Sequence, residues 1–87
     1  ITKMDTDDFS GFMPPGSYAY LLPQPNMQDG GIYIIEIDDE IRVARYRSDG
    51  QPRFETQPRD VSNVQSWFIN NLEYRILYRI TGFYTVL

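Results

Sequence analysis

The chain of 87 residues contains no cysteine and no histidine, and its only lysine is Lys3. Without cysteine it cannot form disulfides, and without cysteine and histidine it cannot form a Cys/His zinc site. A Ser-His-Asp triad is also excluded, because the triad needs a histidine as general base. We expect no cofactor and no bound metal.

Long apolar runs and positive charge are scarce as well. No apolar run approaches the ~20 residues that a membrane-spanning helix needs, so we expect no membrane association. The 12 acidic and 8 basic residues give a net charge of −4, which disfavours nucleic-acid binding by this domain itself. The lack of cysteine fits a cytoplasmic protein, which is the location we expect.

The residues that are present predict one folded domain spanning 1–87. The composition is 41% hydrophobic and 15% aromatic, which is too apolar for a disordered chain. The length allows a single thin core. The sequence begins at Ile1 and not at Met, so we expect a fragment of a longer protein.

Short strands separated by turn residues dominate the pattern. Alternating or continuous apolar residues predict strands, and Pro, Gly and Asp clusters separate them. A polar break at 38–40 predicts a hairpin, and Gly82 predicts a bulge or bend. The expected strands are 17–22, 31–37, 41–47, 53–56 and 74–87.

The segment 60–72 is ambiguous. Its apolar residues are spaced as in an amphipathic helix, with Asp60 or Ser62 as N-cap, and a short helix near 61–71 is expected. A loop with one helical turn fits the same residues. The predicted fold is in either case mostly β, a small fold of short strands and hairpins.

Five segments occur in an order that points to a known family. They are Asp7-Asp8-Phe9; Pro14-Pro15-Gly16 followed by Tyr18 to Leu21; Asp29-Gly30-Gly31-Ile32-Tyr33-Ile34-Ile35; Ile41-Arg42-Val43-Ala44-Arg45-Tyr46; and the tail 74–84. Together they resemble the C-terminal domain of LexA-like and phage repressor proteins, the serine–lysine self-cleaving peptidases. The resemblance implies a LexA-like (signal-peptidase-like) β-fold and an N-terminal helix-turn-helix domain outside this chain. Residues 51–72 match poorly.

Both catalytic positions of that family are substituted. Asp8 stands at the position of the nucleophilic serine, and Ala44 stands at that of the lysine. A serine needs a base to remove its proton, and alanine offers none. The neighbouring Arg45 stays protonated and cannot serve. We therefore predict no catalytic residue and no enzymatic activity.

Other polar groups have simpler interpretations. Ser10 and Ser17 lack a base other than distant Lys3, and turn or strand-end roles are expected for them. The acidic segments 5–8 and 38–40 lack a calcium-loop pattern and are expected to be solvated. Cross-strand ion pairing is the expected role of the basic residues near the hairpin, which are Arg42, Arg45, Arg47 and Arg53.

Large apolar side chains in the last third of the chain exceed what a thin core needs. We take them as candidates for an interface: Trp67, Phe68, Tyr78, Phe83 and Tyr84. Set beside the resemblance, they predict a non-catalytic domain through which a phage- or mobile-element-type transcriptional repressor forms homodimers or larger assemblies. Operator DNA would be bound only through the N-terminal domain, and an antirepressor protein is a further expected partner. A stand-alone small β-barrel that binds a protein or peptide is the alternative; an active self-cleaving peptidase is a weaker one.

Overall fold

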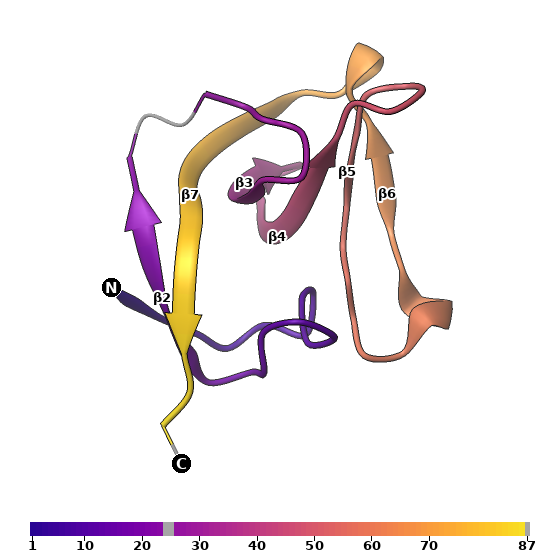
Figure 1. Ribbon diagram of the computed structural model, residues 1–87. Helices are drawn as coiled ribbons and strands as arrows, with labels where there is room; N and C mark the ends of the chain where they lie inside the picture. The colour runs from indigo at the N-terminus through magenta and orange to yellow at the C-terminus, as the bar shows by residue number, and fades with distance from the viewer. Residues whose placement is uncertain (24–25, 87) are drawn as a thin grey trace.

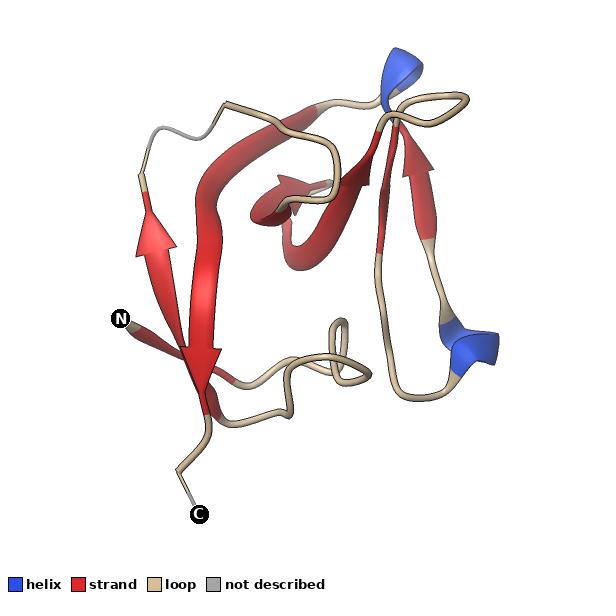
Figure 2. Ribbon diagram, in the orientation of Figure 1, coloured by secondary structure: helices blue, strands red, loops and turns tan. Residues whose placement is uncertain are grey.

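A single curled antiparallel sheet makes up the computed structural model, which describes residues 1–23 and 26–86 (Figure 1). The strand order is β1-β2-β7-β3-β4-β5-β6, so the sheet forms a half-barrel with β1 and β6 at its edges. Figure 2 shows that two single 3-10 turns, η1 and η2, are the only helical pieces of the described chain. The elements are β1 (Thr2–Met4), β2 (Ser17–Leu22), β3 (Ile32–Ile37), β4 (Glu40–Arg47), β5 (Arg53–Glu55), η1 (Val61–Asn63), β6 (Ser66–Phe68), η2 (Ile69–Asn71) and β7 (Tyr74–Tyr84).

The five predicted strands are present with small differences in their ends, whereas β1 and β6 were not predicted. The hairpin between β3 and β4 turns on two residues, Asp38 and Asp39, and Glu40 already pairs with Ile37. Both turn residues have positive φ, 50° and 64°, which matches the right-handed twist of the strands. Aspartate tolerates this conformation better than most residues.

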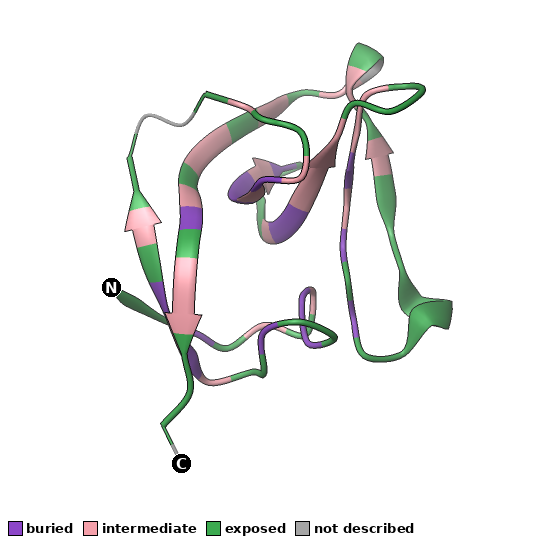
Figure 3. Ribbon diagram, viewed as in Figure 1, coloured by how far each residue is buried: buried purple, intermediate pink, exposed green. Residues whose placement is uncertain are grey.

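The core consists of two clusters on opposite faces of β3 and β4. Ile34 and Val43 belong to the cluster that the loop 5–16 covers, together with Phe9 of that loop. Tyr33 and Ala44 belong to the other cluster. The continuous apolar run of β3 therefore follows from burial on both faces, as Figure 3 illustrates by the purple centre of the sheet.

Strand β7 is long because two bulges let it bend between β2 and β3. Leu21 pairs with Ile80 while Tyr20 pairs with Gly82, which leaves Thr81 as the extra residue. A second register shift lies beside β3, between Ile34 and Ile35. The predicted bulge thus occurs next to Gly82 rather than at it. The last predicted residue, Leu87, is outside the described residues.

The short helix predicted near 61–71 is wrong in this form, because the segment forms η1, an edge strand and η2. Asp60 does cap η1, since its carboxylate accepts the N–H of Ser62 at 3.0 Å. Trp67 pairs with Phe54 across β5 and β6, so its ring joins the cluster around Phe54. This long-range pairing overrides the helical spacing. No helix in residues 1–23 and 26–86 is long and apolar enough to cross a membrane.

Candidate functional site

Asp8 is held against the middle of β4. Its carboxylate accepts two hydrogen bonds from Arg42, at 2.9 Å from Nε and 2.8 Å from Nη2, and one from the backbone N–H of Val43 at 3.1 Å. Its side chain is 15% exposed. In the described chain β5 pairs with β4 only from Arg45 to Arg47, so the N–H of Val43 has no strand partner there. The carboxylate supplies the acceptor that a neighbouring strand would otherwise supply.

Arg42 links this loop to the β6 edge. Its Nη2 also donates to the side-chain oxygen of Gln65, and its guanidinium lies 4.9 Å from the centre of the Trp67 ring. One side chain therefore joins the loop 5–16, β4 and β6. Loop and sheet are joined further by the backbone: the N–H of Gln57 donates to the carbonyl of Asp8 at 2.8 Å.

Ala44 follows Val43 directly, so positions 8 and 44 are close together in the fold. Its methyl group points to the cluster that contains Tyr33 and Phe54, and it has no exposed surface. Neither position carries the hydroxyl or the amine that the resemblance would require, and the carboxylate of Asp8 is bound to Arg42.

The two serines considered as nucleophiles have structural hydrogen bonds. The hydroxyl of Ser17 donates to the carbonyl of Pro14 at 2.6 Å and lies 2.9 Å from the hydroxyl of Thr85. The hydroxyl of Ser10 accepts the N–H of Arg59 at 2.8 Å. Both side chains are buried at the ends of turns or strands, as expected.

The acidic segments do not gather into a metal site. Within residues 1–23 and 26–86, no group of three or more carboxylates is placed to hold a metal ion. Asp8 is bound to Arg42, whereas Asp38 and Asp39 form the exposed hairpin turn. We assign no metal to either segment.

The structure separates the five interface candidates. Trp67 and Phe83 are half-buried and pack against the two core clusters. The other three are exposed, by 51% for Phe68, 41% for Tyr78 and 40% for Tyr84. Phe68 lies on the β6 edge, and the two tyrosines lie on β7, so the five residues do not form one patch.

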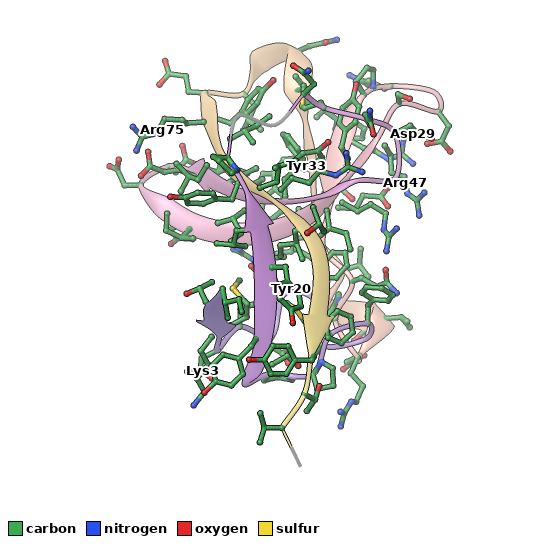
Figure 4. All side chains as sticks on the ribbon, turned by 60° about the vertical axis from the view of Figure 1, so that its left-hand side comes forward. Lys3, Tyr20, Asp29, Tyr33, Arg47 and Arg75 are labelled. Atoms are coloured by element: carbon green, nitrogen blue, oxygen red, sulfur yellow. The ribbon has the colours of Figure 1, made fainter. Side chains whose placement is uncertain are left out.

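A more compact aromatic patch includes two tyrosines that are not among the predicted interface residues. Tyr18 and Tyr84 face each other across β2 and β7 with ring centres 5.4 Å apart, and Tyr20 lies 5.7 Å from Tyr84. We call these three residues the tyrosine strip. In Figure 4 the labelled Tyr20 lies over the β2–β7 surface. The alternation of tyrosines at 18 and 20 was visible in the sequence, but their pairing with position 84 was not.

The four basic residues near the hairpin behave in two ways. Arg42 and Arg53 form ion pairs, the first with Asp8 and the second with Glu55 at 2.5 Å. Hydrogen bonding to Glu55 raises the pKa of Arg53. In the described part of the chain, Arg45 and Arg47 have no carboxylate within 4.0 Å. Neither ion pair joins two strands, because Asp8 lies in the loop 5–16 and Glu55 is on the same strand as Arg53. The predicted cross-strand pairing of these four arginines is therefore wrong for the described chain.

Comparison with known proteins gives no match: no protein family matches the chain, and no curated protein is significantly similar to it.

Proposed function

We propose that this chain is a non-catalytic self-association domain of a LexA-like transcriptional repressor of the phage or mobile-element type. The observation that carries the proposal is the tyrosine strip, an exposed aromatic surface on a small domain. Tyr20 is 45% exposed and Tyr84 is 40% exposed, so both residues present aromatic surface to the solvent. Exposed tyrosines are enriched at protein interfaces because they combine apolar area with a polar hydroxyl.

The surroundings of positions 8 and 44 support the non-catalytic part of the proposal. The carboxylate of Asp8 is bound to Arg42, and Ala44 is buried in the apolar cluster that contains Tyr33 and Phe54. The resemblance assigns a serine and a lysine to these two positions, and self-cleavage requires both. We therefore propose that induction of the repressor proceeds by another route, such as binding of an antirepressor protein.

Dimerisation would place two N-terminal DNA-binding domains on two operator half-sites. Binding of the first half-site makes the second contact intramolecular, which raises the overall affinity without a basic surface on this domain. The proposal is thus compatible with the net charge of −4. The cytoplasm is the location that such a regulator requires.

Light scattering over a concentration series tests the self-association. We expect a dimer or a larger assembly, and the variant Tyr20→Thr should weaken it at least tenfold, since aromatic residues dominate interface energies. Threonine retains a high strand propensity, so β2 should persist. A wild-type chain that remains monomeric at every concentration would contradict the proposal.

The matched control is Phe68→Thr on the edge strand β6. Phe68 is 51% exposed, close to the 45% of Tyr20, so the two changes remove similar exposed aromatic surfaces. We expect Phe68→Thr to leave the assembly intact. If only Phe68→Thr dissociates it, self-association stands but the tyrosine strip is not the interface.

Incubation of the full-length protein at alkaline pH, or with the activated recombinase filament that triggers the family, tests the absence of catalysis. We expect no serine-dependent fragment. The double variant Asp8→Ser with Ala44→Lys supplies both missing residue types. Cleavage by this variant alone would support the assignment of positions 8 and 44 to the family's serine and lysine. Cleavage by the wild-type protein would contradict a non-catalytic domain.

A second candidate function is a stand-alone module that binds a protein or peptide. It is favoured by a cleft of about 440 Å³ between the β3–β4 hairpin and β6, with Arg42 and Trp67 in its lining. The intact gene product distinguishes the two functions. An upstream helix-turn-helix domain favours the repressor, and its absence favours the module.

A further inference from the structure

The register of β4 and β5 leaves two arginines without a carboxylate partner. Arg45 lies opposite Glu55 in the ladder, a position at which an ion pair is expected. Glu55 instead binds Arg53 on its own strand, and Arg53 also lies 3.4 Å from Asp49. Arg45 and Arg47 are therefore two neighbouring cations without a paired anion among the described residues.

The two arginines line a pocket of about 320 Å³ on this side of the sheet, together with Glu55, Thr56, Gln57 and Val64. The uncharged polar groups of the pocket have donors available. The hydroxyl oxygen of Thr56 accepts the N–H of Gln65 at 2.9 Å, so its proton can be donated elsewhere. The side-chain oxygen of Gln57 accepts from Arg45 at 3.3 Å, so its NH₂ group is also a donor.

The charge of Arg45 is only partly compensated. Its guanidinium donates to the carbonyl of Gly30 at 3.1 Å and lies 5.5 Å and 5.6 Å from the rings of Phe9 and Phe12. Its Nε is buried and has no hydrogen-bond acceptor in the described chain. Burial lowers the pKa of Arg45, and the charge of Arg47 lowers it further. A guanidinium nevertheless stays protonated in proteins, so an added anion would be stabilised here.

We propose that this pocket, with Arg45, Arg47, Thr56 and Gln57 as its donors, binds a tetrahedral oxyanion of the phosphate class. Guanidinium groups bind phosphate through paired, charge-assisted hydrogen bonds. Phosphate carries more charge and more acceptor atoms than a carboxylate, which suits two cations and two neutral donors. The proposal does not depend on self-association, because the tyrosine strip is on β2 and β7 and the pocket is on β4 and β5.

Titration of the ¹⁵N-labelled chain with inorganic phosphate, at constant ionic strength, tests the proposal by NMR. We expect saturable shifts of the backbone amides of residues 45, 47, 56 and 57, with a Kd of about 1 mM or tighter. Sulfate should act at the same amides, and acetate should bind more weakly. Sodium chloride should not produce saturable shifts.

Three variants identify the donors. Arg47→Gln should weaken phosphate binding about tenfold or more, since it removes a charge-assisted contact. Arg75→Gln is the control: Arg75 is 68% exposed on β7 and forms an ion pair with Glu36, and Figure 4 labels it on the opposite side of the view from Arg47. It should leave the affinity unchanged. Glu55→Gln should tighten binding, because it removes the carboxylate that lines the pocket.

Absence of saturable shifts with phosphate would overturn the proposal, as would equal shifts with chloride or tighter binding of acetate. An unchanged affinity of a folded Arg47→Gln variant would also overturn it. If Arg47→Gln does not fold, Glu55→Gln decides, since an unchanged or weaker affinity of that variant is incompatible with the site.

Discussion

Arg42 and Arg45 are three residues apart on β4, yet their surroundings differ. Arg42 has a bidentate carboxylate, the side chain of Gln65 and the ring of Trp67 around it. Arg45 has a carbonyl, an amide oxygen and two phenyl rings, with its Nε unpaired in the described structure. The first arginine is neutralised by a carboxylate of the chain itself, whereas the second has no such partner in the described structure.

The difference follows from the alternation of side chains along a strand and from the divergence of β5. Residues 42 and 45 lie on opposite faces of the sheet, because Arg42 pairs with Ile35 and Arg45 with Ile32. The gap beside Val43 admits Asp8 from the loop 5–16. Beside Arg45, β5 is still paired, and its acidic residue is bound to Arg53. Ion pairing in this sheet therefore depends on geometry and not on the number of acids nearby.

Asp8→Ala should have the largest effect on stability. The variant leaves Arg42, whose side chain is 21% exposed, without its carboxylate, and it leaves the N–H of Val43 without an acceptor. We expect the free energy of unfolding to fall by about 2–3 kcal/mol, less than for a fully buried pair. Urea unfolding measures it.

A double-mutant cycle with Arg42→Met sharpens this prediction. If Asp8 acts mainly through Arg42, Asp8→Ala should destabilise the Arg42→Met background clearly less than the wild type. Asp7→Ala, a change at an exposed neighbour, is the control and should alter stability by less than about 0.5 kcal/mol. Equal effects of Asp7→Ala and Asp8→Ala would contradict the assigned role of the pair.

The pKa of Asp29 is lowered chiefly by the hydrogen bond from the backbone N–H of Ser48 and to a smaller extent by the charge of Arg47. Measuring the free energy of unfolding at decreasing pH tests the effect of this shift on stability. A lowered folded-state pKa adds stability above the ordinary value of 3.8, and this contribution is lost as the pH falls through the folded-state value. Asp29→Asn should flatten the decline of stability as the pH falls below 3.8. An identical decline in both proteins would rule out this contribution.

Arg47→Gln should have the smallest effect on stability in the absence of added anions. Arg47 has no carboxylate within 4.0 Å in the described chain, its charge opposes that of Arg45, and its attraction to Asp29 is only a minor cause of the lowered pKa of Asp29. We expect a change within about 0.5 kcal/mol in either direction. A loss as large as that of Asp8→Ala would indicate an internal partner and would remove the contrast between the two arginines.

Local patterns predicted most of the sheet. The strand 17–22 has the predicted ends, and 31–37 and 41–47 differ from β3 and β4 by one residue at one end. These strands have apolar residues in a period of two or in a continuous run, and turn residues bound them. The strand β6 was missed because Trp67 and Phe68 are in helical spacing with Val61 and Val64, and only the edge of β5 makes the strand favourable.

The candidate site was less predictable. Asp8 and Ala44 were selected through the resemblance, but the bond between Asp8 and Arg42 joins residues 34 positions apart, and no local pattern encodes it. The sequence could not decide which acid would pair with which arginine. The tyrosine strip depends in the same way on the register between β2 and β7.

The sequence by itself determined that this is a β-rich domain without cysteine or histidine chemistry, because composition and strand periodicity are local properties. Only the tertiary structure decided which polar groups are satisfied. The pairing of β5 with β4 reaches Arg45 but not Val43, whose N–H donates to Asp8 instead. Arg42 is consequently paired with a carboxylate of the chain, whereas Arg45 has no carboxylate partner in the described structure.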